Sequence, residues 1–144
     1  MLIGEYQHTL DPKKRLSLPS KFRKELGKTT IITRGLDNCL FIYAPAVWKK
    51  LTEKFTELSL GSTDTRGFNR FMLSGAVDTE VDGAGRVLIP DFLKDFAELK
   101  TDVVVAGIGN RVEVWDRKRW DEYKKRIEME ANQIAQKLGD IGAI

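Results

Sequence analysis

The cations of this chain that could bind a polyanion gather in one short turn. Residues 10–19 read LDPKKRLSLP, so Lys13, Lys14 and Arg15 follow closely on Asp11. Lysine contacts phosphate oxygens, and arginine can donate paired hydrogen bonds to O6 and N7 of guanine. The pattern predicts a turn on a β-ribbon that could enter a DNA major groove. An ordinary solvated basic face is the alternative.

The same phrase returns 71 residues later without its lysines. Residues 81–90 read VDGAGRVLIP, which places Asp82 on Asp11 and Arg86 on Arg15. After one inserted residue, residues 31–43 (IITRGLDNCLFIY) align with residues 103–115 (VVVAGIGNRVEVW). We interpret the chain as two copies of one unit. The backbone pattern is kept in both copies and the cations are found in one, which favours a polyanion site in the first unit and a scaffold in the second.

Charge is divided unequally between the halves of the chain. Residues 1–72 contain 13 Lys or Arg and 7 Asp or Glu, whereas residues 73–144 contain 11 and 14. Seven of the bases fall in residues 8–28, including Lys21, Arg23, Lys24 and Lys28. This asymmetry indicates a polyanion-facing surface in the first half.

The other residues of the phrase are expected to shape the turn. Asp11 and Asp82 stand where an aspartate accepts hydrogen bonds from the backbone two or three residues on. Gly83 and Gly85 supply positive φ angles in the second turn. Alternation in the strand that follows puts Arg15 and Ser17 on an exposed face, opposite the apolar residues. A buried Asp11–Arg15 pair is the competing interpretation.

Each unit predicts the same succession of elements. A strand, the turn and a second strand lead to a proline-opened helix, which Gly27 can end in the first unit. A β-hairpin follows, and helical patterns close the units over residues 45–58 and 64–73, and from Asp116, as a cap, to about residue 138. We expect a first unit at 1–60, a helical connector at 61–73 and a second unit at 74–144. Four short strands leave unpaired edges, so two interlocked copies should form one small barrel with pseudo-two-fold symmetry.

The last helix has a regular apolar seam. Its spacings are 3, 4, 4, 3 and 4 residues, at Trp120, Tyr123, Ile127, Ala131, Ile134 and Leu138. They approach the period of about 3.5 residues found in coiled coils. Packing on its own barrel and contact with another subunit are both open for the first two turns, and subunit contact is favoured for the later ones.

Enzymatic and metal-dependent functions find little support in the residue types. His8 and Cys39 are the only histidine and cysteine, which leaves no site built mainly from these ligands. Cys39 lies in a strand pattern and is expected in the core rather than as a nucleophile. No phosphate-binding glycine motif occurs, so no cofactor is expected. No apolar run approaches the roughly 20 residues that span a membrane, and no signal peptide is recognised. The single cysteine leaves no disulfide framework, which favours a reducing, cytoplasmic setting.

The residues GEYQHTLDPKKRLSLPSKFRKEL, followed by VDGAGRVLIP, resemble the MraZ family of bacterial transcriptional regulators. The resemblance implies an α+β fold dominated by a β-barrel, with two tandem SpoVT-AbrB swapped-hairpin units forming a pseudo-dimeric barrel with peripheral helices. It also implies a closed ring of subunits that binds short direct repeats in double-stranded DNA. The protein would then usually repress its own operon, in the cell-division and cell-wall gene cluster, and associate with the nucleoid.

The resemblance assigns the DNA-contacting arginine to Arg15 and its counterpart to Arg86. The candidate DNA-binding residues are therefore Lys13, Lys14, Arg15, Ser17, Lys21 and Arg86. Lys14 departs from the family pattern, which usually has glycine there, so either the lysine tolerates that backbone angle or the turn differs. Alternative functions are a ring-forming assembly protein that binds other proteins, an antitoxin-like module and, as the weakest candidate, an unrecognised enzyme.

Overall fold

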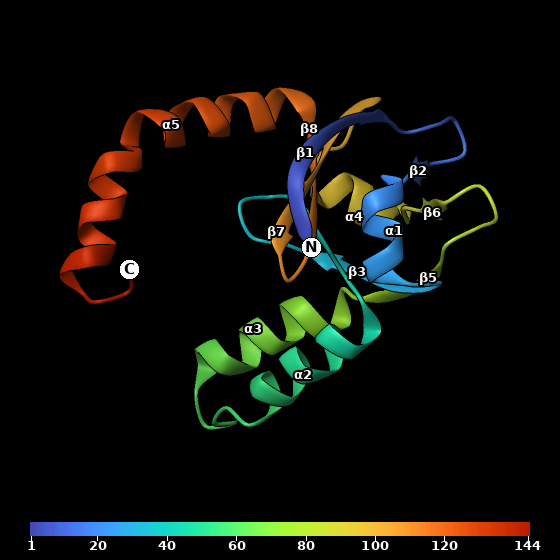
Figure 1. Ribbon diagram of the computed structural model, residues 1–144. Helices are drawn as coiled ribbons and strands as arrows, with labels where there is room; N and C mark the ends of the chain where they lie inside the picture. Colours follow the sequence, from blue (N-terminus) through green and yellow to red (C-terminus); the bar gives the residue numbers. More distant parts are fainter.

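The computed structural model describes residues 1–144 and contains eight strands and five helices (Figure 1). The strands are β1 (Leu2–Thr9), β2 (Arg15–Ser17), β3 (Thr29–Arg34), β4 (Leu40–Tyr43), β5 (Val77–Glu80), β6 (Arg86–Leu88), β7 (Asp102–Gly109) and β8 (Val112–Asp116). The helices are α1 (Ser20–Leu26), α2 (Pro45–Thr56), α3 (Thr63–Ser74), α4 (Asp91–Phe96) and α5 (Arg117–Asp140). Strands β1–β4 and β5–β8 are the equivalent elements of the two repeats.

Six strands form one antiparallel sheet in the order β1-β7-β8-β4-β3-β5. The first strand of each repeat pairs with the third strand of the other, β1 with β7 and β5 with β3. Exchanging the two repeats leaves this order unchanged, which is the topology of a swapped pair with pseudo-two-fold symmetry. Because each repeat supplies an edge strand to the other, neither can complete its sheet alone.

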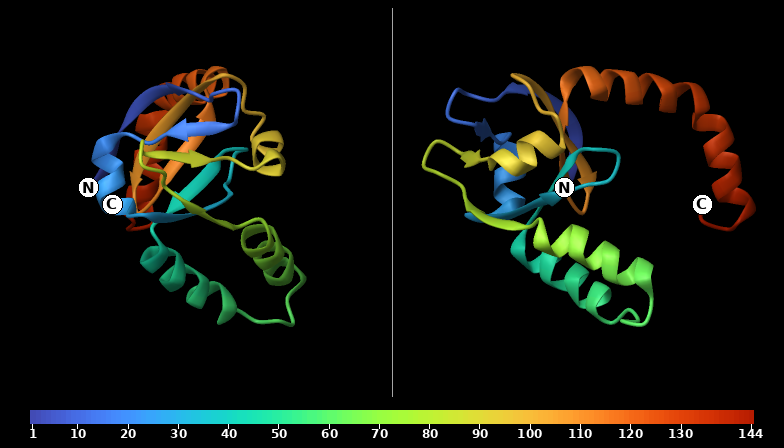
Figure 2. Two further views of the ribbon diagram at one scale, coloured as in Figure 1. Left: turned by 90° about the vertical axis from the view of Figure 1, so that its right-hand side faces the viewer. Right: turned by 180° about the vertical axis from the view of Figure 1, so that it is seen from behind.

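The remaining two strands form a separate ribbon. Strand β2 pairs with β6 in a two-stranded sheet, with Leu16 opposite Val87. The expected α+β class is confirmed, but the expected closed barrel is corrected to an open six-stranded sheet covered by this ribbon. A single bridge between Leu10 and Leu16 joins the end of β1 to β2, which is too little pairing to merge the sheet and the ribbon into a closed barrel. Figure 2 shows the ribbon lying across the sheet.

The main core lies between the sheet, the ribbon and the two short helices. Leu16 and Val87 on the inner face of the ribbon are fully buried, and so are Phe22 of α1 and Leu93 of α4. Both repeats therefore fill a single core of 18 buried residues. Truncation of a buried phenylalanine such as Phe22 to alanine is expected to cost about 3–5 kcal/mol. This shared core holds the ribbon, and with it both turns, in one orientation.

The helices between the repeats form an antiparallel pair below the sheet (Figure 1). The expected helices at 45–58 and 64–73 are present as α2 and α3, and Phe55 packs on Phe68 with ring centroids 5.3 Å apart. Cys39 is buried in the cluster beside them, as expected for a core residue. Burial raises the pKa of its thiol well above the ordinary value, so the thiolate is disfavoured at neutral pH.

Helix α5 leaves the sheet, bends and extends away from it (Figures 1 and 2). Its first two turns are anchored on Trp115, whose ring lies 5.4 Å from Trp120 and 4.9 Å from Tyr123. Asp116 stands at its N-cap position, but the expected side-chain cap is absent because the carboxylate accepts the backbone N–H of Lys100 instead. No residue of α5 is fully buried.

Candidate nucleic-acid interface

The first turn is organised around the carboxylate of Asp11. Its Oδ1 atom accepts the backbone N–H groups of Lys13 and Arg15, both at 2.9 Å. Its Oδ2 atom accepts the Nε–H of Arg15 at 2.6 Å. These bonds, led by the one from the backbone of Arg15, hold the pKa of Asp11 below its ordinary value. The carboxylate thus shapes the turn and directs the guanidinium at the same time.

The second turn repeats this arrangement with the same atoms. Asp82 accepts the backbone N–H groups of Ala84 and Arg86 at 2.9 Å and the Nε–H of Arg86 at 2.9 Å. The pKa of Asp82 is lowered, first by the hydrogen bond from the backbone of Arg86. The arginine side chains of the two turns are equally exposed, at 32% each. Neither Asp–Arg pair is therefore buried, and both arginines keep their Nη groups available.

The fourth residue of each turn adopts a left-handed backbone conformation. Gly85 has a φ angle of +80°, and Lys14, at the equivalent position, has a φ angle of +62°. The expected positive φ at Gly83 is wrong, because the turn needs a left-handed residue only at its fourth position. The lysine thus keeps the backbone of the glycine it replaces, which for a residue with a Cβ costs about 1–2 kcal/mol. Its carbonyl accepts the N–H of Ile89, and the carbonyl of Gly85 accepts that of Leu18. These reciprocal bonds link each turn to the other repeat.

The ribbon brings both arginines onto one surface. Arg15 pairs with Leu88 and Ser17 with Arg86, and these four residues alternate with the buried Leu16 and Val87. Arg15 and Arg86 are therefore diagonal neighbours on the outer face, with a typical spacing of about 7–8 Å. Because β2 and β6 run antiparallel, the two turns lie at opposite ends of this ribbon, on the same side of the molecule (Figures 1 and 2). The arrangement places two arginines on the same face of the ribbon from sequence positions 71 residues apart.

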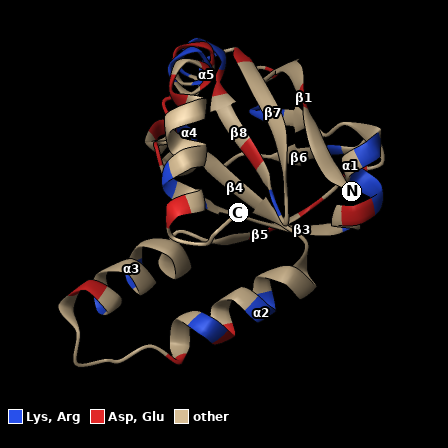
Figure 3. Ribbon diagram, turned by 60° about the vertical axis from the view of Figure 1, so that its left-hand side comes forward, with Lys and Arg blue, Asp and Glu red and all other residues tan.

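The lysines around the first turn differ in their partners. Lys13 is exposed at the tip and has no ion pair, and Lys21 is exposed on α1. Lys14 forms an ion pair with Asp91 at the start of α4. The sequence analysis did not predict this pair. The only hint in the sequence is that the second repeat has an acidic residue, Asp91, where the first repeat has the uncharged Ser20. Figure 3 shows the ribbon of α1 coloured mainly for Lys and Arg, with an acidic segment beside them.

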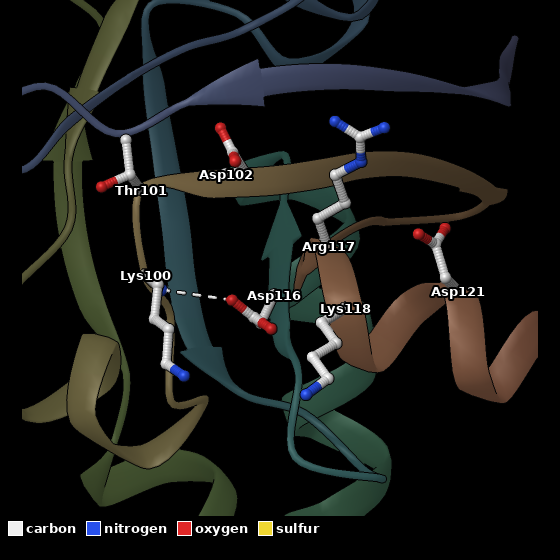
Figure 4. A pocket seen from close by; sticks show the side chains of 7 residues that line it. All are labelled: Lys100, Thr101, Asp102, Asp116, Arg117, Lys118 and Asp121. Atoms are coloured by element: carbon white, nitrogen blue, oxygen red, sulfur yellow. Dashed lines mark hydrogen bonds between the residues drawn. The ribbon is translucent and has the colours of Figure 1, made fainter.

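A polar hollow at the start of α5 is the other candidate for chemistry (Figure 4). Its lining residues come from the start of β7, the end of β8 and the first turns of α5: Lys100, Thr101, Asp102, Asp116, Arg117, Lys118 and Asp121. Cations and carboxylates are equal in number there, and Asp116 is committed to the backbone of Lys100. No group of three or more metal-ligating side chains lies together in the chain.

The single histidine lies near the first turn but does not belong to it. His8 lies in β1, outside the turn, and burial lowers the pKa of its imidazole below the ordinary value. The neutral form of the imidazole is therefore favoured. None of the five helices is both long enough and apolar enough to cross a membrane.

Comparison of the sequence with known proteins shows similarity to one family. A sequence model described as "MraZ protein, putative antitoxin-like" matches the chain twice, at residues 1–71 and 72–140. The chain is 46% identical to a protein of Caldanaerobacter subterraneus subsp. tengcongensis named transcriptional regulator MraZ, over 96% of each chain. A protein of the same name from Natranaerobius thermophilus is 46% identical over 97% of this chain and 98% of its own length. The similarity covers nearly the whole chain, including both Asp-x-x-x-Arg turns.

Proposed function

Because the chain belongs to the MraZ family, we propose that it is a DNA-binding transcriptional regulator that represses its own operon. The operon would be the cell-division and cell-wall cluster, and the target would be short direct repeats upstream of it. One observation carries the proposal: the ribbon β2–β6 presents two Asp-directed arginines, Arg15 and Arg86, on a single exposed face. A cytoplasmic, nucleoid-associated protein follows from this role.

A two-stranded β-ribbon is an element that the DNA major groove admits. With Nε held by Asp11, the guanidinium of Arg15 keeps both Nη groups for a base edge. That geometry suits the O6 and N7 acceptors of guanine. Arginine held in advance loses less side-chain entropy when it binds. Arg15 is therefore assigned direct base contact, and Arg86 is assigned a second contact from the same ribbon.

The neighbouring polar residues position the ribbon on the phosphates. Lys13 and Lys21 are exposed and Ser17 lies on the outer face, so all three can reach the backbone of the duplex. Lys14 joins them when its pair with Asp91 opens. Contacts of this kind fix register and carry little sequence information. They also make binding fall steeply with salt, because each one releases a condensed counterion.

A ring of subunits explains why direct repeats would be the target. Head-to-tail interfaces that close produce rings, and adjacent subunits then present identical turns at a fixed spacing. Repeats roughly 10 bp apart would meet successive turns on one face of the DNA. Several weak contacts made together gain affinity through effective concentration. The later turns of α5 are the proposed assembly contact, since Met129 is 80% exposed there and Leu138 is 37% exposed.

The test is a fluorescence-anisotropy titration with DNA from upstream of the gene and with scrambled DNA. Wild type should prefer the upstream DNA. Arg15→Ala should lose that preference, with a cost of about 1–3 kcal/mol for each engaged turn. Arg15→Lys is the matched variant, since it keeps the charge but lacks the paired donors. Repeating the titration at two salt concentrations measures the phosphate contacts separately.

Circular dichroism and the unfolding midpoint must show that the variants remain folded. Equal affinity for both DNAs, unchanged by Arg15→Ala, would contradict the proposal. It would favour a ring-forming assembly protein, for which the exposed apolar residues of α5 are the supporting observation. Deletion of residues 127–144 then separates the two functions. It should reduce the oligomer mass measured by light scattering while the sheet stays folded.

A further inference from the structure

Two hollows lie at equivalent places in the two repeats, each beside one of the turns. The hollow at the second turn has a volume of about 690 Å³, and that at the first turn about 390 Å³. Arg23 and Lys28 line the larger hollow where the alignment puts Lys94 and Lys100 in the smaller one. Both are built across the repeats, because the larger one combines α1 of the first repeat with the turn of the second.

The difference in size follows from two aligned positions. The side chain of Lys14 lines the smaller hollow, whereas its counterpart in the larger one is Gly85, which has no side chain. The guanidinium of Arg23 lies across Gly85, so closely that a Cβ there would be 2.0 Å from its Nη1 atom. Pro12 lacks a backbone N–H, whereas Gly83 has one that donates to no group of the chain. The larger hollow therefore has more room and one more free donor.

The cations of the larger hollow have no internal partners. Neither Arg23 nor Lys28 forms an ion pair within the chain. The Nε atom of Arg23 is buried and has no hydrogen-bond partner. A buried donor left unpaired is costly and calls for an acceptor. The carboxylate of Asp82 is committed to its own turn, which leaves Glu80 as the one free carboxylate of the lining.

We infer that the hollow beside the second turn binds a phosphate-class oxyanion between the guanidinium of Arg23, the ammonium of Lys28 and the N–H of Gly83. A planar guanidinium suits the oxygens of a phosphate, and a lysine and a backbone N–H complete a concave set of donors. The smaller hollow offers lysines on flexible stems and less space, so it should bind the same anion more weakly. The phosphate could belong to a free small molecule or to the DNA backbone.

Inorganic phosphate and pyrophosphate are the probes, titrated into the full-length protein without DNA. Isothermal calorimetry at constant ionic strength, with chloride as the reference anion, should show saturable binding. Arg23→Gln should weaken it about tenfold or more, the effect of losing one charge-assisted contact. Arg23→Lys should retain part of the affinity. Glu80→Gln should tighten binding, because it removes the free carboxylate from the lining.

Lys94→Gln is the matched control, since Lys94 is the counterpart of Arg23 in the smaller hollow. It should leave phosphate affinity within about twofold of wild type. Absence of saturable binding in wild type would overturn the inference, and so would a larger loss in Lys94→Gln than in Arg23→Gln. The unfolding midpoints of Arg23→Gln and Lys94→Gln must match wild type within a few degrees. Glu80→Gln is a further control, because a misfolded protein would not bind phosphate more tightly.

A titration in the presence of target DNA distinguishes the two sources of phosphate. Competition between DNA and inorganic phosphate would support the site and assign it to the DNA backbone. Simultaneous binding would support it as a site for a free phosphorylated molecule. Phosphate binding itself is measured without DNA, so a failure of the proposed DNA-binding function would leave this test intact.

Discussion

In the first turn Asp11 holds the backbone N–H groups of Lys13 and Arg15 at 2.9 Å, and in the second turn Asp82 holds those of Ala84 and Arg86 at the same distance. The two turns thus share one skeleton although the three residues between aspartate and arginine are all different. The aspartate, the arginine and a left-handed fourth position suffice to build it. The cations are therefore free to differ, and they do so where contact with DNA is proposed.

The left-handed fourth position of the first turn carries a lysine, and this lysine lowers the stability of the turn. Gly85 takes its φ angle of +80° without strain, whereas Lys14 is held at +62° with a side chain attached. The pair with Asp91 offsets part of that cost. The difference indicates that the first turn gives up stability for a positive charge at this point.

The largest expected effect comes from making the first turn like the second. Replacing Pro12, Lys13 and Lys14 by Gly, Ala and Gly keeps the skeleton and removes two cations. DNA affinity should fall by tenfold or more at moderate salt, and the slope of log K against log salt should decrease by about 1 per lysine lost. Anisotropy at several salt concentrations measures both quantities. An unchanged slope would show that the lysines do not contact phosphate.

The next effect is on stability and should differ between the turns. Gly85→Ala places a Cβ in a left-handed position and against the flexible end of Arg23, so it should lower the free energy of unfolding by about 1–2 kcal/mol. Lys14→Gly relieves the same strain and should leave stability unchanged or raise it by up to about 1 kcal/mol. Urea unfolding of the two variants is the measurement. Destabilisation of both by the same amount would contradict the proposed cost of Lys14.

A smaller effect is expected from the ion pair that restrains Lys14. Asp91→Asn should free this lysine and raise DNA affinity up to about fivefold, the range for an exposed pair. Asp95→Asn is the matched control, since Asp95 lies on the same helix and forms no ion pair. An equal gain in both variants would point to general electrostatics rather than to Lys14.

The smallest effect is the pH dependence of the turn carboxylates. Asp11 and Asp82 have pKa values lowered by hydrogen bonds in the folded state, so each stabilises the fold above the ordinary carboxyl pKa of about 3.9. That contribution is lost as the pH falls below this value. Asp11→Asn and Asp82→Asn should therefore be less stable than wild type at pH 7 and should converge with it in acid. Parallel curves for wild type and variants would argue against the hydrogen-bonded carboxylates.

Much of the fold could be predicted because the signals are local. Proline at a helix start, glycine at position 27, β-branched hairpins and apolar periodicity act within a few residues. They indicated the helices at 45–58 and 64–73 and the hairpins of both repeats. The last helix is predicted to end at about residue 138, before Gly139, but α5 continues through Gly139 to Asp140. A single glycine near the end of a helix costs only about 1 kcal/mol, so its neighbours can carry the helix past it.

The sequence by itself determined the duplication, the two Asp-x-x-x-Arg turns and the concentration of cations in the first, because these depend on residue identity and spacing alone. Only the tertiary structure decided that the strands of the two repeats exchange places in one open sheet and that Arg15 and Arg86 share a face. It also decided that Lys14 meets Asp91 and that Arg23 crosses Gly85. These contacts join residues more than 60 positions apart. Their energies depend on how one shared core packs, which no local pattern records.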